Sequence, residues 1–266
     1  MTAARPATKP RLPLRASPQP APSIGSAIAP RLVRFAGISS GDKVLDVACG
    51  TGVVALTAAR LGASCIGVDL TPDLIARARE NSALMKLDVH WHEGDAEALP
   101  LGDAQFDVVV SQFGHMFAPR PEIAIKEMLR VLKPGGTIAF STWPPEMFVG
   151  RSSAISARYA PPPPGIGIAP PPQWGDPQIV RERLGAQVKD LCFARDVMWF
   201  QTLSPAHMRV FMERNIGPMA RMVATLETSD PQKLASFRSE MEALIGEYFE
   251  DNHLRQDYLL TRAVKA

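Results

Sequence analysis

The sequence predicts an α/β fold in which a mostly parallel sheet carries helices on both faces. Apolar segments of strand length alternate with longer segments whose apolar residues recur at helical spacing, and this alternation is typical of strand–helix–strand units. The first such segment, residues 44–47, has the branched apolar character of a strand buried on both faces. The chain has 266 residues, 46% of them apolar, which is enough for one large domain with a substantial core.

The elements of the first half can be placed in order along the chain. We expect strands at residues 43–47, 64–69, 88–93, 106–111 and 136–142. One helix is expected to begin at Thr71 or Asp73 and to end near Met85. A second helix, at residues 122–132, presents a broad apolar face formed by Ile123, Ile125, Met128, Leu129 and Leu132. The next residues, Lys133-Pro134-Gly135-Gly136, are expected to stop this helix and form a turn.

The composition changes after residue 145. Two proline runs, at 161–164 and 170–172 with two glycines between them, predict a loop or an extended arm. We then expect a strand at 188–200, a helix from Ser204 to Asn215, a further helix at 231–249 and a closing strand at 258–264. The elements of this second half therefore complete the sheet and add helices to it.

Charge and cysteine content limit the classes of partner. Residues 1–40 carry six basic side chains and no acidic one, so the rest of the chain has four more acidic than basic residues. We therefore do not expect nucleic acid as a partner. No run of about eighteen apolar residues predicts a transmembrane segment, and the three cysteines form neither a metal-ligand pattern nor a disulfide framework. A cytoplasmic location fits this composition best, and a homo-oligomer is possible.

A glycine-rich turn follows the first strand. Gly50-Thr51-Gly52-Val53-Val54-Ala55 satisfies the dinucleotide fingerprint G-x-G-x-x-G/A, so NAD and hydride transfer are one interpretation. We expect the glycines to be needed because a side chain at Gly50 or Gly52 would hold a nucleotide-like ligand away from the backbone. An NAD oxidoreductase would also need a hydride-handling set such as Tyr-x-x-x-Lys, which this sequence lacks.

Three acidic residues lie at or near the ends of successive predicted strands. Asp46 lies inside the first strand, Asp69 ends the second, and Asp95 follows the third. Asp69 is placed to accept ribose hydroxyls, as in NAD sites, and does not discriminate between ligands. Asp46 and Asp95 favour a ligand with a cationic amine over a pyrophosphate, because unlike charges attract at short range. S-adenosylmethionine (SAM) carries such a cation. Each acid taken alone could equally be a turn or capping residue.

Four motifs in order and at compatible spacing carry a family resemblance. DVACGTG, GVDLTPDLIARARE, EGDAEALPLGDAQFDVVVS and EMLRVLKPGGTIAFSTW resemble class I SAM-dependent methyltransferases, most closely the type found in ubiquinone and menaquinone biosynthesis. The resemblance covers roughly residues 30–145. It implies a Rossmann-like, seven-stranded, mostly parallel sheet with helices on both faces and a C-terminal helical lid insertion.

Composition and the resemblance together suggest a domain organisation, in which the proline-rich segments come from composition and depart from the resembled enzymes. Residues 1–23 would form a disordered, proline-rich basic tail, and residues 24–145 the SAM-binding α/β core. Residues 146–187 would be a proline-rich arm or lid. Residues 188–266 would complete the sheet and supply a helical cap on the acceptor side.

Cofactor-binding residues follow from the same resemblance. Asp46, with the turn formed by Cys49, Gly50, Thr51 and Gly52, would contact the methionine part of SAM. Asp69 would bind the ribose, Leu70 would flank the adenine, and Asp95 with Ala96 would contact the adenine amino group. Ser111 and Gln112, which end the fourth strand, would line the methyl-donor site.

The implied reaction is an in-line displacement that moves the methyl group of SAM to a small-molecule acceptor. Positioning supplies most of the rate in such a reaction, so no catalytic residue is assigned and no metal is expected. His115 is the one titratable group expected near the methyl, as a tentative substrate contact, although a packed histidine is the commoner case. Apolar surroundings for the acceptor would come from Phe113, Met116, Phe117 and Trp143. A non-catalytic SAM-binding protein remains an alternative.

Overall fold

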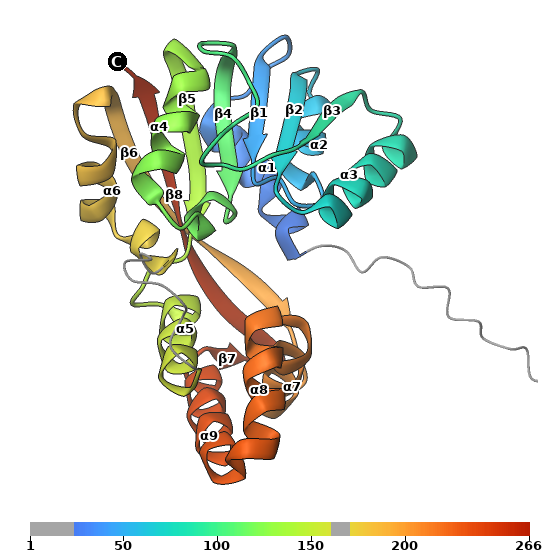
Figure 1. The fold of residues 1–266 in the computed structure, drawn as a ribbon, viewed down its shortest axis with the longest axis vertical. Coiled ribbons are helices and arrows are strands. Elements are labelled where there is room, and N and C mark those ends of the chain that lie inside the picture. The colour runs from blue at the N-terminus through green and yellow to red at the C-terminus, as the bar shows by residue number, and fades with distance from the viewer. Residues whose placement is uncertain (1–23, 161–170) are drawn as a thin grey trace, which may run out of the picture.

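A computed structural model describes residues 24–160 and 171–266. Within these ranges it contains one sheet, whose strands are β1 (Lys43–Val47), β2 (Ser64–Asp69), β3 (Val89–Glu93), β4 (Phe106–Gln112), β5 (Leu132–Thr142), β6 (Val188–Gln201), β7 (Phe249–Glu250) and β8 (His253–Lys265). Seven of the described strands follow the order β3-β2-β1-β4-β5-β8-β6, and the short β7 pairs with β8 (Figure 1). Neighbours among β1 to β5 are parallel, whereas β8 runs antiparallel to β5 and β6. The predicted fold class is confirmed.

The five predicted strands of the first half are present, and one of them differs at its start. β5 begins at Leu132, before the predicted residue 136, because Leu132 already pairs with Phe106 of β4. The register then jumps to the pair Val108 and Thr137, so the intervening Lys-Pro-Gly-Gly segment bulges out of the ladder. Gly135 has a φ of +74° in this bulge. The expected turn is therefore an irregular start of the strand.

Helices cover both faces of the sheet. On one face lie α1 (Ala29–Ala36), α2 (Val53–Ala59) and α3 (Pro72–Met85), and on the other lie α4 (Pro121–Val131) and α6 (Pro177–Leu184) (Figure 1). The predicted helices at 71–85 and 122–132 are confirmed. Buried apolar residues form a separate core on each face, so the strands between them are apolar on both sides, as their sequences predicted.

A group of helices forms a cap beyond the carboxyl ends of the parallel strands. The cap consists of α5 (Phe148–Tyr159), α7 (Pro205–Asn215), α8 (Gly217–Ser229) and α9 (Pro231–Glu247), and the long strands β6 and β8 extend from the sheet to reach it (Figure 1). It has its own core, rich in methionine: Met208, Met212, Met219, Met222 and Met241 pack with Phe148, Phe237 and Leu244. The three cores are thus two on the sheet and one in the cap.

The segment 146–187, predicted as an arm or lid, contains more helix than its proline runs suggested, and its role as a lid stays a prediction. α5, α6 and the short 3-10 helix Pro171–Gly175 occupy much of this segment, and α8 lies where no element was predicted. Proline explains part of the error, because each described α-helix other than α2 and α5 has a proline in its first turn. At that position the ring starts a helix instead of breaking it. The predicted tail at 1–23 and the arm residues 161–170 lie outside the described residues.

Candidate functional site

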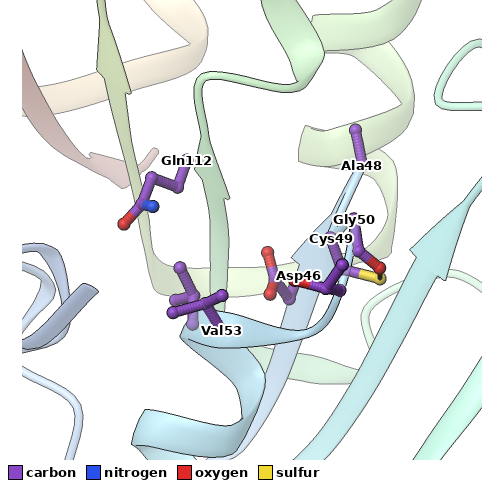
Figure 2. A pocket seen from close by; sticks show the side chains of 8 residues that line it. Asp46, Ala48, Cys49, Gly50, Val53 and Gln112 are labelled. Atoms are coloured by element: carbon purple, nitrogen blue, oxygen red, sulfur yellow. Dashed lines mark hydrogen bonds between the residues drawn. The ribbon is translucent and has the colours of Figure 1, made fainter. Parts of the chain in front are cut away.

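A cavity opens where β1 turns into α2. Ala48, Gly50 and Gly52 have φ values of +52°, +54° and +82°, so the backbone reverses sharply between Val47 and Val53. Figure 2 shows the carboxylate of Asp46 pointing into the space between this turn and Gln112 of β4. The lining residues are Asp46, Ala48, Cys49, Gly50, Thr51, Val53, Val54 and Gln112. Five predicted cofactor residues therefore line one cavity: Asp46, Cys49, Gly50, Thr51 and Gln112.

The two glycines of the turn serve different purposes. A Cβ atom at Gly52 would lie 2.3 Å from the indole of Trp91, whereas a Cβ at Gly50 would meet open space. Gly52 is not among the lining residues. The expectation that Gly52 makes room for a ligand is thus wrong, because Trp91 fills that position. Gly50, by contrast, faces the cavity.

Asp46 is an isolated carboxylate in the cavity wall. Its side chain is buried, with 1% of the residue exposed. The backbone N–H of Ala55 donates to Oδ2 at 3.0 Å, and within the described chain Oδ1 has no hydrogen-bond partner. Burial raises the pKa of Asp46 to about 7, the Ala55 hydrogen bond lowers it, and the charge of Asp69 raises it further. A ligand cation would supply the missing partner.

Asp69 connects the turn to the next strand end. Its Oδ2 accepts the backbone N–H of Gly50 at 2.8 Å, and its Oδ1 accepts that of Thr71 at 2.9 Å. The Asp69 carbonyl accepts the N–H of Gly94, which brings the turn after β3 alongside. Asp95 lies in that turn, where its Oδ1 accepts the N–H of Glu97 at 2.9 Å. The three acids therefore lie at the ends of the adjacent strands β1, β2 and β3, although Asp69 and Asp95 do not line the cavity itself.

Three further predicted residues lie beside the cavity and not in its wall. Leu70 is 65% exposed next to Asp69, and Ala96 is half-buried next to Asp95. Ser111 is fully buried, donates to the carbonyl of Val47 at 2.7 Å and accepts the N–H of His115 at 3.0 Å. Its hydroxyl thus joins the ends of β1 and β4. This gives Ser111 a structural role in place of the predicted contact with the donor.

His115 is placed in the core, away from the cavity lining. Its ring lies 4.5 Å from that of Phe140 and 4.8 Å from that of Trp174, and neither ring nitrogen has a hydrogen-bond partner in the described part of the chain. Burial, with a smaller effect from the charge of Arg183, lowers the pKa of His115 to about 3. This placement does not support the expected substrate contact, because a neutral, enclosed imidazole cannot reach the donor.

Aromatic residues follow directly on Gln112. Phe113 has a φ of +59°, a strained value for a bulky residue, and stacks on Trp143 with ring centroids 3.9 Å apart. Tyr258 meets the Phe113 ring edge-on at 6.0 Å. Of the other residues expected at the acceptor, Met116 is buried in a sheet core and Phe117 is 66% exposed. The aromatic wall beside the cavity thus consists of Phe113, Trp143 and Tyr258.

Sequence reasoning missed three residues of the cavity: Ala48, Val53 and Val54. Ala48 escapes detection because alanine gives no signal of a positive φ. Gly114, in the loop after β4, packs against this residue, since a Cβ at Gly114 would lie 2.4 Å from the Ala48 carbonyl oxygen. Gly114 therefore lets the loop after β4 lie against the turn after β1. Val53 and Val54 occupy positions of the glycine fingerprint that accept any residue, so their side chains gave no signal of the cavity.

Two negative findings apply to residues 24–160 and 171–266. No described helix combines the length and the apolar character that crossing a membrane requires. Nor do the described histidine, cysteine and acidic side chains gather in groups of three or more that could hold a metal ion.

Comparisons with known proteins identify a methyltransferase domain in this chain. Residues 45–140 match a family model described as a methyltransferase domain. An uncharacterised protein of Mycobacterium tuberculosis is 36% identical over 251 residues, which cover 92% of this chain and 89% of the relative. The demethylmenaquinone methyltransferase of Thermus thermophilus is 38% identical over 117 residues, 43% of this chain and 53% of the relative. The fold is similar to that of a crystal structure of a methyltransferase from Bacillus halodurans, with a TM-score of 0.59, 20% identity and coverage of 90% and 99% of the two chains.

The fold and the cavity together define the class: an open α/β sheet with a buried carboxylate in a cavity at the carboxyl ends of its strands. Since the matched methyltransferase domain includes the cavity and its glycine turn, this class can be narrowed. The chain is a methyltransferase with its methyltransferase domain at residues 45–140, and it transfers a methyl group from SAM to a small-molecule acceptor.

Proposed function

We propose that Asp46 holds the ammonium group of SAM and that the turn at Cys49, Gly50 and Thr51 surrounds its methionine part. The observation that carries this proposal is the unpartnered Oδ1 of Asp46, a buried acceptor in a cavity wall. A buried carboxylate oxygen without a hydrogen-bond partner is costly, and an ammonium group would supply that partner by a charge-assisted hydrogen bond. The residues present therefore fit the cofactor.

Asp69 and Asp95 extend the proposed site along the sheet edge. Each oxygen of Asp69 accepts one backbone N–H, so each keeps a lone pair with which to accept a ribose hydroxyl. Asp95 uses one oxygen in its turn and is exposed, so it can accept the adenine amino group, with Leu70 and Ala96 beside the ring. Donor binding would thus follow the strand order β1, β2, β3.

The chemistry proposed for this site depends on position. When bound, SAM supplies a methyl group on a sulfonium, which is already a good leaving group. Alignment and exclusion of water can contribute roughly 7 to 11 kcal/mol, more than a single general base supplies. Gln112 and the aromatic wall would orient the acceptor opposite the methyl for in-line attack. No described histidine lines the cavity, and this mechanism needs none.

We propose an aromatic or lipid-like acceptor that approaches past the wall of Phe113 and Trp143. Support comes from the stacked rings beside Gln112, and the Thermus thermophilus relative, by its name, methylates a demethylmenaquinone. We further propose that nucleic acid is not an acceptor, that the protein acts in the cytoplasm, and that it can form a homo-oligomer. The excess of acidic residues outside the basic N-terminal segment favours the first of these proposals.

Transfer of labelled methyl groups tests the function. Incubation of the protein with methyl-labelled SAM and a small-molecule extract of host cells should give a labelled product that mass spectrometry identifies. Calorimetric binding of S-adenosylhomocysteine (SAH) without any product across a broad acceptor panel would instead indicate a non-catalytic SAM-binding protein. A nicotinamide absorbance change with a substrate would favour the oxidoreductase.

The variant Asp69→Ala tests the placement of the donor. We expect SAH binding to weaken by about 1.5 to 3 kcal/mol, since charge-assisted hydrogen bonds are lost. Because Asp69 also holds Gly50 and Thr71, Asp69→Asn is the matched variant that keeps the side-chain shape and one carbonyl acceptor. Wild-type affinity in Asp69→Ala, measured by calorimetry on folded protein, would remove Asp69 from the site.

A further inference from the structure

We propose that Asp46 carries a proton in the ligand-free protein near neutral pH, and that the ammonium group of the donor displaces this proton when it binds. The proposal rests on the proposed function, because it concerns the same carboxyl group and the same ligand. It makes proton release a part of donor binding, so the site would hold donor and product more weakly in acid.

The geometry around Asp46 favours a neutral acid. The residue is 1% exposed, and among described groups only the N–H of Ala55 donates to it. One hydrogen bond is little compensation for a buried negative charge, which needs a cation or several donors. A protonated carboxyl avoids that cost and can direct its O–H at the cavity.

The groups that face Asp46 do not include a cation. From β2 come Asp69, a second acid, and Cys65, and from the turn comes Cys49; burial raises the pKa of both thiols. From α2 come the apolar Val53 and Val54, and from β4 comes the neutral amide of Gln112. None of the ion pairs among the described residues includes Asp46. The pKa of about 7 that burial gives Asp46 agrees with this environment.

Binding of an ammonium group reverses the balance. The carboxyl O–H bond breaks, the proton leaves to solvent, and the carboxylate oxygen accepts a hydrogen bond from the ammonium group. Charge in the buried site is then neutralised by the ligand, so the charged form of Asp46 becomes the stable one. Since one proton leaves for each ligand bound, affinity must rise with pH as long as the free protein is protonated.

Calorimetry of SAH binding measures the proton directly. Titrations at pH 6, 7 and 8, each in two buffers of different ionisation enthalpy, give the number of protons released. We expect release of close to one proton at pH 6, about half a proton at pH 7 and about a tenth of a proton at pH 8. The association constant should fall about fivefold to tenfold between pH 7 and pH 6.

Two comparisons assign the proton to Asp46. Methylthioadenosine lacks the amino-acid part of SAH, so it should bind without proton release. Asp46→Asn should bind SAH weakly, also without release, whereas His115→Leu, which removes another buried group with a strongly shifted pKa, should release protons as the wild type does. The methylthioadenosine comparison decides the matter even if Asp46→Asn does not fold.

The outcomes separate this inference from the proposed function. SAH binding with no proton release at pH 6 and 7 would overturn the inference and leave SAM binding intact. Equal release with methylthioadenosine, or release that persists in Asp46→Asn, would also overturn it. Absence of SAH binding at every pH to folded wild-type protein would instead refute the proposed function.

Discussion

Asp46 links the donor site to the pH dependence of folding. Its pKa is raised from 3.8 to about 7 in the folded protein, so between these values the native state binds more protons than the unfolded state. The stability that this residue contributes is therefore present in acid and lost as pH rises toward 7. At pH 8 the ligand-free protein keeps a buried charge that the fold does not need.

Asp46→Asn should remove this penalty. We expect the variant to gain stability relative to the wild type as pH rises from 4 to 8, by on the order of 3 kcal/mol. Urea denaturation of the ligand-free proteins at several pH values measures this difference. A difference that does not change with pH would show that Asp46 is ionised over this whole range in the folded protein, as it is in the unfolded chain.

His115 acts in the opposite direction. Its pKa is lowered from 6.5 to about 3, so the unfolded state binds more protons between these values, and its contribution to stability is lost as pH falls from 6.5. In His115→Leu this loss should be absent, and the stability of the variant relative to the wild type should increase toward pH 4. Acid denaturation followed by circular dichroism tests this, with retained methyl transfer as the second readout. Loss of transfer in folded variant protein would return a chemical role to His115.

At the scale of elements, Trp91 of β3 holds the glycine turn against α3. Its indole lies where a Cβ of Gly52 or Gly67 would be, and its Nε1–H donates to Ser82 of α3 at 3.2 Å. Gly52→Ala should therefore combine overpacking with a φ of +82° and cost about 2 to 5 kcal/mol of unfolding free energy. Gly50→Ala is the matched control, because Gly50 also has a positive φ, +54°, but an added Cβ there would meet no neighbouring atom. This variant should lose only about 1 to 2 kcal/mol of unfolding free energy.

A double-mutant cycle isolates the contact with Trp91. If the clash is the cause, Trp91→Leu combined with Gly52→Ala should cost less than the two single changes together, by about 1 to 3 kcal/mol. Urea denaturation of the four proteins gives this coupling. Additive costs would show that the backbone angle alone makes Gly52 necessary.

The elements that the sequence predicted well share a simple physical signal. β1, β2 and β4 are short apolar runs with an acid or a polar residue in their last two positions, and α3 and α4 begin with proline and keep an apolar face. Their local preferences agree with the fold. α5 buries only Phe148, Gly150 and Ser152, so its sequence carries little helical signal. α8 does carry an apolar stripe at helical spacing, formed by Met219, Met222, Val223 and Leu226, but it opens with Gly217-Pro218 and was not predicted. Contacts with α9 and the other cap helices stabilise these segments.

For the site, the sequence located residues but not the direction of their side chains. The motif at 46–52 placed Asp46, Cys49, Gly50 and Thr51 correctly at one turn. Ser111 and Gln112 are neighbours on one strand, so their side chains alternate, and only Gln112 reaches the cavity. His115 illustrates the same limit, since the loop after β4 turns it under Trp174. Such orientation depends on contacts between distant segments.

At the scale of the whole molecule, the cap and the sheet have separate cores. The cap core draws on β6 and β8 only through Phe200 and Leu254 at its edge. The donor cavity lies in the sheet, at the turn between β1 and α2. Because the cap lies beyond the carboxyl ends of the parallel strands, it faces the side on which an acceptor would enter (Figure 1). Loss of the cap should therefore affect the acceptor more than the donor.

Phe237→Ala tests this division. Phe237 of α9 is fully buried in the cap core, beside Tyr159 of α5, and its truncation should cost about 3 to 5 kcal/mol within the cap. Leu84→Ala on α3 is the control, since Leu84 is 79% exposed and its truncation should change stability by less than about 0.5 kcal/mol.

We expect the Phe237 variant to bind SAH within twofold of the wild type, because the proposed donor cavity lies at the turn between β1 and α2 and not in the cap. The same variant should transfer methyl groups to extract acceptors much more slowly. Calorimetry and labelled transfer at a temperature where circular dichroism still shows the sheet separate the two effects. Parallel loss of SAH binding would mean that cap and sheet fold as one unit, and undiminished transfer would mean that the cap does not contribute to the acceptor site.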